Sequence, residues 1–208
     1  MKHLNQEDMK SSEKLVGLSD QDYELVAEAL GCEPAVVQAL QIVESGGRGG
    51  FVAPGMPTML FEGHVFWREL LKRRINPKEF AKGNEDILYP RWSRKHYLGG
   101  VAEYDRLERA IAIHQEAALA AASWGMFQIM GFNHSLCEIP SVIEIVEAMQ
   151  ENEASQLQLL GRFLKHAGMM PALQRKDWKR FAMLYNGPGY DRNAYDVKLE
   201  CAYQTLIR

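Results

Sequence analysis

Apolar residues recur at helical spacing in the first part of the chain. One stretch follows the N-cap candidates Ser19 and Asp20 and ends at Gly31. A second begins at Pro34, a residue that fits the first turn of a helix, and continues to about Glu44. Both stretches are predicted to be helices, because they combine a start signal, a periodic apolar face and a glycine stop.

The same periodicity continues toward the C-terminus. A long Ala-rich helix is predicted over 103–122, and a final helix is predicted after a cap at Asn193. The final helix turns one face inward, formed by Tyr195, Leu199, Ala202 and Leu206. Further helices are predicted over 65–74, from a capping box at 141–144, from 152 or 153 to about 168, and over 178–185.

Extended structure is predicted at one place only. Residues Thr58–Glu62 alternate between polar and apolar, which predicts a short strand with a bend near Gly63. Glycine and proline dominate from Gly46 to Pro57, so a loop is expected there. Residues 79–98 show no readable pattern. The chain is therefore expected to be mostly helical.

The composition fits a single domain, or one domain divided into two lobes. The chain has 208 residues, of which 47% are hydrophobic, enough for a proper core. A net charge of −3 predicts no nucleic-acid binding, and the basic runs at 72–74 and 91–95 are interpreted as solvated surface. No apolar run approaches the roughly 18 residues needed to span a bilayer, so stable membrane insertion is not expected.

The N-terminus and the cysteines indicate where the chain folds. Residues Met1–Lys14 are polar and lack the hydrophobic core of a signal peptide. Cys32, Cys137 and Cys201 form an odd set without close pairing, which argues against a disulfide framework. Folding in a reducing cytoplasm is therefore expected, and a substrate outside it would require a separate route of release.

Glu44 carries the first candidate chemistry. On a helix it falls in the same arc as the apolar residues Val36, Val37, Leu40 and Val43. Burial disfavours the charged carboxylate, and the negative end of the helix dipole acts in the same direction, so the pKa of Glu44 is expected to be raised. This would make Glu44 a general acid near neutral pH. The alternative is a carboxylate that points into solvent beside a glycine cap.

A second candidate segment spans residues 123–131 (SWGMFQIMG). Trp124 and Met126 offer apolar surface, and Gln128 is the only amide in the run. Such a surface suits a sugar, whose apolar ring faces stack while an amide binds a hydroxyl or an N-acetyl group. The alternative is a buried helix start with methionine and phenylalanine as core residues.

The third candidate segment spans residues 184–190 (LYNGPGY). The Asn-Gly pair fits a helix C-cap, and Gly-Pro-Gly favours a tight turn that would aim Tyr185 and Asn186 into a cleft. Structural capping alone explains the glycines, but it leaves the flanking tyrosines unexplained.

In this order the segments resemble the lysozyme-like glycosidases, including goose-type lysozymes and soluble lytic transglycosylases. The sequence is most similar to the N-acetylmuramidase family of phage endolysins. The resemblance covers about Leu18 to the C-terminus, and its motifs are specific only in combination. They are VESGGRGGF at 43–51, PTMLFEGH at 57–64, FW at 66–67, ASWGMFQIMGFN at 122–133, YNGPGY at 185–190 and YDVKL at 195–199.

The resemblance implies a lysozyme-like α+β fold, predominantly α-helical, with the active site in a groove between two lobes. It also implies that Glu44 is the catalytic acid. Glycosidases that invert or retain need a second carboxylate, whereas a transglycosylase manages with one. Glu62 is the candidate, on a strand face shared with Thr58 and Leu60. The alternative is a structural ion pair between Glu62 and His64 or an arginine.

The remaining expectations concern substrate contacts and organisation. Substrate binding is assigned to Ser45, Phe61, His64, Trp124, Met126, Gln128, Tyr185 and Asn186. Residues 1–208 are expected to form a single muramidase domain and a monomer, with 65–110 as a candidate smaller lobe inserted in the main helical lobe. No separate wall-binding module is expected.

The predicted function is a muramidase that cleaves the β-1,4 bond between N-acetylmuramic acid and N-acetylglucosamine in peptidoglycan. A phage endolysin of this kind would fold in the host cytoplasm and reach the wall through a separate pore-forming holin. No cofactor or metal is predicted, because the six histidines show no ligand spacing and no HExxH motif is present. The alternatives are a lytic transglycosylase, a non-catalytic wall-binding protein, and a zinc or thiol enzyme.

Overall fold

The computed structural model describes residues 17–46 and 49–208. The polar segment Met1–Lys14 and the predicted helix stop at Gly47 lie outside the described residues. The chain divides into two compact units. The first unit comprises the described residues up to Gly50 together with Asn152–Arg208, and the second is Phe51–Glu151. The predicted smaller lobe, 65–110, lies inside the second unit, which extends further at both ends.

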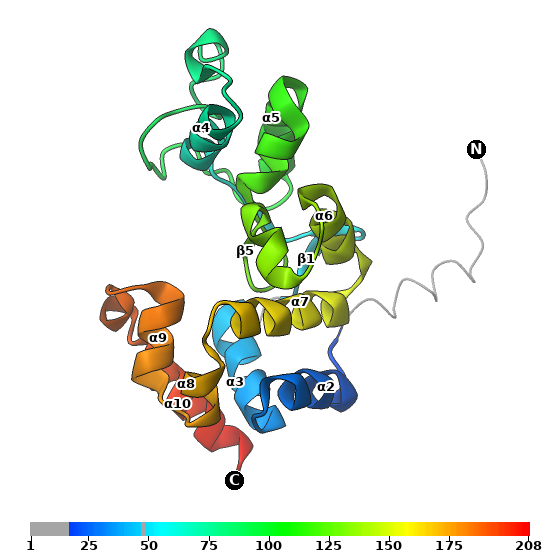
Figure 1. Cartoon of the computed structure of the whole chain (residues 1–208), viewed down its shortest axis with the longest axis vertical. Helices are drawn as coiled ribbons and strands as arrows, with labels where there is room; N and C mark the ends of the chain where they lie inside the picture. Colours follow the sequence, from blue (N-terminus) through cyan, green and yellow to red (C-terminus); the bar gives the residue numbers. More distant parts are fainter. Residues whose placement is uncertain (1–16, 47–48) are drawn as a thin grey trace, which may run out of the picture. The chain divides into compact units, whose positions relative to one another are not determined.

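The first unit is entirely helical in its described part. Helix α3 packs against both α2 and α10, α2 also packs on α7, and α9 packs on α10 (Figure 1). Ser19 caps α2 in a capping box with Asp22, and Gly31 ends it in the left-handed conformation with φ 66°. The helices are α2 (Asp20–Leu30), α3 (Pro34–Ser45), α7 (Glu153–His166), α8 (Met170–Gln174), α9 (Trp178–Asn186), the 3₁₀ turn η4 (Tyr190–Asn193) and α10 (Tyr195–Leu206).

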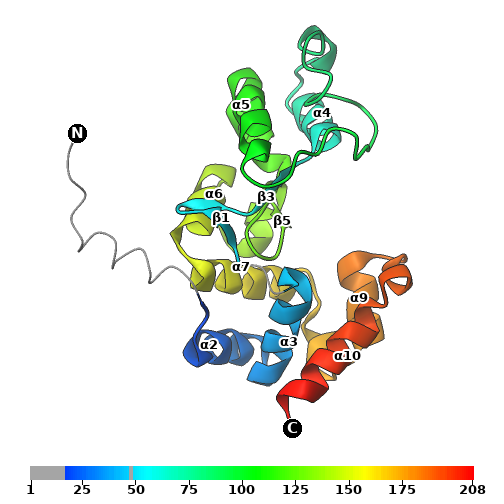
Figure 2. The same ribbon diagram turned by 180° about the vertical axis from the view of Figure 1, so that it is seen from behind.

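The second unit combines short strands with helices. Strands β3 (Met59–Phe61), β4 (Ala122–Trp124) and β5 (Ile129–Met130) form an antiparallel sheet in that order, and β1 (Phe51–Ala53) pairs with β2 (Met56–Pro57). Helix α4 lies beside α5 (Figure 2). Helix α4 follows β3 along the chain, and α5 precedes β4. The helical elements are α4 (Gly63–Lys72), η2 (Pro77–Glu79), α5 (Ala102–Ala120), η3 (Gly131–Cys137) and α6 (Val142–Glu151).

The structure confirms the predicted α+β class with helix in excess, and most predicted helices begin and end within a few residues of their expected bounds. Of the capping box predicted at 141–144, the N-cap bond is present, since Ser141 Oγ accepts from the backbone N–H of Glu144, and the same hydroxyl donates to the Glu144 carboxylate. The short predicted strand is β3, and its burial alternates as expected.

Several local predictions were wrong. The expected loop at 46–57 contains the β1–β2 hairpin, and 123–131 contains the end of β4 and all of β5. Asn193 does not cap α10, because it belongs to η4 and Ala194 precedes the helix in the left-handed conformation. Helix α5 is kinked at His114, whose φ of −162° and ψ of 107° are extended. The missed strands β1, β2, β4 and β5 have only two or three residues each, which is too short for an alternating pattern to identify them from the local sequence.

The membrane expectation concerns helix length. Across the described residues, no single helix is both long enough and apolar enough to cross a bilayer. One pair, α2 with α3, passes by length and composition together, but it is bent by 109°.

Candidate active site

Glu44 lies in the last turn of α3, in the first unit. Val36, Val37 and Leu40 are buried on the same helix, and Glu44 is half-buried at the end of their stripe. Gly46 ends the helix in the left-handed conformation with φ 55°, and its N–H donates to Ile42 O. The sequence therefore directs a carboxyl group toward the protein interior, as predicted from the helical spacing.

Tyrosines from the C-terminal part of the chain surround this carboxyl group. The Tyr195 hydroxyl donates a hydrogen bond to Glu44 Oε1. The Tyr195 ring stacks on the Tyr185 ring at 6.1 Å, and Tyr185 stacks on Phe181 at 5.4 Å. The rings of Phe181, Tyr185 and Tyr195 form a stack, called here the tyrosine stack, which reaches Glu44 through the Tyr195 hydroxyl. Aromatic stacking of this kind holds the hydroxyl of Tyr195 in place.

The electrostatics of the site follow from this burial. Desolvation raises the pKa of Glu44, and the hydrogen bond from Tyr195 opposes the rise. Burial and the nearby Glu44 charge raise the pKa of both Tyr185 and Tyr195, so both hydroxyls stay protonated. Glu44 is thus a carboxyl group that retains its proton to higher pH than an ordinary glutamate, as a general acid requires.

Two other predicted residues lie in the same unit. Ser45 is buried, and its Oγ accepts from Gln41 Nε2 at 3.1 Å. Asn186 is exposed at the end of α9, and its side chain hydrogen-bonds Tyr195, which lowers the pKa of that hydroxyl. The structure therefore brings Asn186 and Tyr185 to Glu44 through Tyr195, whereas the Ser45 hydroxyl binds Gln41 of the same helix.

Glu62 occupies a different environment, in the second unit. It is the N-cap of α4, directly after β3, and its side chain is 15% exposed. The Tyr97 hydroxyl donates to Glu62 Oε2 at 2.6 Å, and His64 Nδ1 lies 3.2 Å from the same oxygen. Desolvation lowers the pKa of His64, against the opposing charge of Glu62. His64 is therefore a neighbour of Glu62, as considered from the sequence, but its lowered pKa makes the ring neutral near pH 7, so the contact is not a charged ion pair.

The loop that carries Tyr97 is anchored by a buried ion pair. Glu103 Oε1 accepts from the backbone N–H groups of Leu98 and Gly99, at 2.6 and 3.1 Å. Its other oxygen binds Arg106 Nη1 at 2.7 Å, and Arg106 is 1% exposed. Arg106 also donates to Phe61 O at 3.0 Å. The pair thus fixes both the strand before Glu62 and the loop whose tyrosine binds Glu62.

A close backbone approach lets this loop reach the start of α4. A Cβ atom at Gly63 would lie 2.6 Å from Ile87 O and 2.5 Å from the Tyr89 ring. Glycine is therefore required at this position, and the predicted bend at Gly63 is the first residue of α4.

Three predicted substrate-binding residues pack in the core of the second unit instead. Phe61 is 0% exposed and Trp124 is 1% exposed, and Met126 is buried as well. Trp124 Nε1 donates to Leu119 O, which satisfies its polar group within the protein. The protein itself covers these three side chains, which argues against the predicted sugar contacts.

Gln128 is exposed, but its amide closes a turn. Its backbone is left-handed with φ 50°, and its Nε2 donates to Gly125 O at 2.9 Å. Its Oε1 accepts from Ser123 Oγ at 2.8 Å. Both ends of the amide therefore bind the β4–β5 hairpin itself.

No group of three or more histidine, cysteine or carboxylate side chains in residues 17–46 and 49–208 is arranged to hold a metal ion. His3 lies outside these residues. His134 Nδ1 donates to Ile139 O, and His114 Nδ1 accepts from the N–H of Ala117. These two rings serve local backbone groups.

A desolvated carboxyl group held by a tyrosine hydroxyl, in a predominantly helical α+β fold, is typical of a glycosidase that uses general acid catalysis. The family model of N-acetylmuramidase matches residues 33–207. The chain therefore belongs to the N-acetylmuramidase family. It is a glycoside hydrolase of the muramidase type, as the sequence motifs predicted.

The likeness extends to a solved structure. The crystal structure of Burkholderia AP3 phage endolysin is similar to this chain with a TM-score of 0.83 and 40% sequence identity. The match covers 90% of this chain and 71% of that chain. It confirms the predicted lysozyme-like fold. No curated protein sequence matches the chain significantly.

Proposed function

We propose that the protein is a phage endolysin that cleaves the bond between N-acetylmuramic acid and N-acetylglucosamine, with Glu44 as the general acid. The observation that carries this proposal is the placement of Glu44, half-buried at the end of α3 and bound by Tyr195. Burial of a carboxyl group lowers the stability of the fold, so its presence at this position favours a functional role. The raised pKa of Glu44 suits proton donation to the leaving sugar oxygen.

Replacement of Glu44 by glutamine tests this role. Glu44→Gln keeps the size and the hydrogen bond to Tyr195 but has no proton to donate, so we expect a loss of about 10²-fold or more in activity on purified peptidoglycan. The melting temperature should stay the same or rise, because a desolvated acid is removed. Glu28→Gln, at an exposed position of α2, is the matched control and should keep full activity. Clearing of peptidoglycan by Glu44→Gln at near wild-type rate would refute the assignment.

For Glu62 we propose the second role, that of orienting the attacking water. The Tyr97 hydroxyl binds one of its oxygens and His64 lies beside the same oxygen, an arrangement that suits a group that directs a water molecule. A transglycosylase needs no such group, because a hydroxyl of the muramic acid itself attacks and releases an anhydro sugar.

The products separate these two mechanisms by the mass of one water molecule. We expect mass spectrometry of the digest to show muropeptides with an ordinary reducing end. Glu62→Gln should lose about tenfold or more in activity while unfolding at the wild-type denaturant concentration. Glu108→Gln, an exposed change on α5, is the control. Mainly anhydro products from the wild type would establish the transglycosylase mechanism instead, and an active Glu62→Gln would remove Glu62 from the site.

Release to the wall is part of the same proposal. The described residues contain no single helix able to span a bilayer, and we propose that a separate holin lets this monomeric endolysin out of the host cytoplasm. Expression of the chain alone in the cytoplasm should leave cell density constant until the inner membrane is permeabilised. Prompt lysis without permeabilisation would show that no holin is needed.

A further inference from the structure

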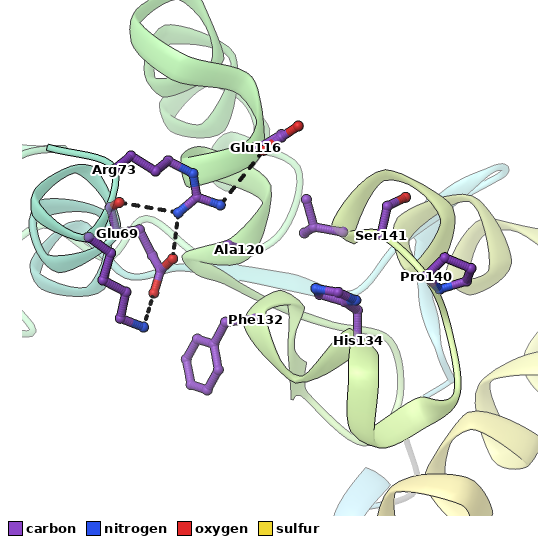
Figure 3. Close-up of a pocket in the computed structure, with 10 residues that line it drawn as sticks. Glu69, Arg73, Glu116, Ala120, Phe132, His134, Pro140 and Ser141 are labelled. Carbon is purple, nitrogen blue, oxygen red and sulfur yellow. Dashed lines mark hydrogen bonds and ion pairs between the residues drawn. The ribbon is translucent and has the colours of Figure 1, made fainter. Parts of the chain in front are cut away.

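A pocket of about 380 Å³ opens in the second unit between α4, α5, η3 and the start of α6. Glu69 of α4, Arg73 at the C-cap of α4 and Glu116 of α5 lie on one side of it, and His134 and Ser141 lie on the other (Figure 3). None of these residues belongs to the surroundings of Glu44 or Glu62 described above. One wall of the pocket therefore carries both positive and negative side chains, and the opposite wall carries an imidazole and a hydroxyl group.

The charged wall is held rigidly by Glu69, whose side chain is 5% exposed. Its carboxylate accepts from Lys72 Nζ at 2.6 Å and from Arg73 Nη1 at 2.7 Å, and its backbone oxygen accepts from Arg73 Nη1 at 3.1 Å. Within the described residues, Arg73 Nη2 makes no hydrogen bond, and its nearest carboxylate oxygen, on Glu116, is 3.9 Å away. The guanidinium is thus fixed in orientation and has donors to spare, beside a carboxylate that is 58% exposed.

The opposite wall is less charged. His134 Nδ1 lies 2.8 Å from Ile139 O, and because a carbonyl only accepts, Nδ1 carries a proton and fixes the ring. Phe132 is 40% exposed, and Lys72 Nζ lies 5.5 Å from the centre of its ring. The buried Val142 adds aliphatic surface. This wall suits the methyl groups and amides of a short chain.

We propose that this pocket binds the stem peptide of peptidoglycan, through a residue that carries both a free amine and a carboxylate. A neutral sugar carries no charge that would pair with a guanidinium and a carboxylate placed side by side. A diamino acid with a free amine and a carboxylate is complementary to both groups. Its carboxylate would bind Arg73 and its ammonium would bind Glu116, while the adjoining alanine methyl packs on Phe132.

The position of the pocket on α4 supports this assignment, which rests on the proposed function. Glu69 follows Glu62 by seven residues, so the two lie about 10 Å apart along the helix axis. Ala120 lines the pocket, and the next carbonyl, Ala121 O, accepts the backbone N–H of Glu62 at 3.0 Å. A peptide attached to a muramic acid bound near Glu62 is therefore within reach of the pocket.

The test compares two substrates and two opposite charge changes. Cleavage is measured on intact peptidoglycan and on glycan strands whose stem peptides have been removed by an amidase. Arg73→Gln and Glu116→Gln are expected to lower the ratio of kcat/KM on intact strands to that on peptide-free strands by about three- to tenfold each. Lys82→Gln, an exposed change in the same unit, is the control and should keep the wild-type ratio.

The two variants separate a peptide site from simple charge attraction. Loss of a cation weakens binding to an anionic wall and loss of an anion strengthens it, so opposite shifts of the ratio would overturn the proposal, as would two unchanged ratios. An NMR titration of the whole chain with a soluble stem tetrapeptide that contains the diamino acid should shift the amide signals of Phe132 and His134. The absence of any shift would also overturn the proposal. If the wild type cleaves neither substrate, the proposed function fails and not the pocket alone.

Discussion

The two candidate carboxyl groups, Glu44 and Glu62, are held in contrasting ways. Glu44 is desolvated and bound by a tyrosine hydroxyl that belongs to a stack of aromatic rings. Glu62 ends a strand and is bound by Tyr97 and His64, beside a buried ion pair. The first environment favours a protonated acid, and the second fixes the direction of one oxygen. The contrast matches the division of work between proton donor and water-orienting group in a glycosidase.

The two supports also differ in how they respond to substitution. The tyrosine stack is apolar packing, which tolerates a change that keeps ring and volume. The Glu103–Arg106 pair is almost fully buried, so removal of one partner leaves an uncompensated charge in the interior. The second unit is therefore expected to be the more fragile of the two around its carboxylate.

The largest expected effect follows from breaking that pair. Arg106→Met should lower the free energy of unfolding by about 3–5 kcal/mol, because Glu103 is left buried without its cation. Arg109→Met is the matched control, since Arg109 pairs with Asp86 at the surface and should cost less than about 1 kcal/mol. Urea denaturation followed by circular dichroism measures both. Equal losses from the two variants would show that the buried pair has no special role.

The next effect concerns pH and the first support. The hydrogen bond from Tyr195 lowers the pKa of Glu44, so Tyr195→Phe should raise that pKa further. A general acid works only while protonated, and activity is lost as pH rises through its pKa. The alkaline limb of the pH–activity profile should therefore move to higher pH in Tyr195→Phe, with the stack preserved.

Tyr185→Phe provides the control for this shift. The Tyr185 ring stacks as in the wild type, and its hydroxyl influences Glu44 only as a nearby group. We expect its alkaline limb to move less than that of Tyr195→Phe. A limb that moves to lower pH in Tyr195→Phe would contradict the assigned hydrogen bond.

The sequence predicted the helices and the inward position of Glu44 better than the surroundings of Glu44. Ser19, Gly31 and Glu44 could be placed because caps and helical spacing are local signals. Tyr195 was predicted to face inward and lay in a family motif, yet its contact with Glu44 spans 151 residues and has no local signature. The same holds for Tyr97, in the stretch without a readable pattern.

The burial of Phe61 and Trp124, which were predicted to contact sugar, could not be read from the sequence for a different reason. Trp124 and Phe61 stand in motifs rich in aromatic residues, and an apolar pattern reports burial without saying whether a ligand or the protein covers the ring. Gln128 was correctly recognised as the polar group of its run, but the hairpin that uses its amide depends on pairing between β4 and β5.

The smallest expected effect is that of metal removal, which would leave both carboxyl sites as they are. In the described part of the chain, no three histidine, cysteine or carboxylate side chains are grouped as metal ligands, and the role proposed for Glu44 needs no cation. Dialysis against EDTA should therefore leave the rate on purified peptidoglycan unchanged. Purified peptidoglycan is used as the substrate because EDTA itself affects whole cells. Activity that is lost on dialysis and restored by zinc would mean that the division of roles between Glu44 and Glu62 is incomplete.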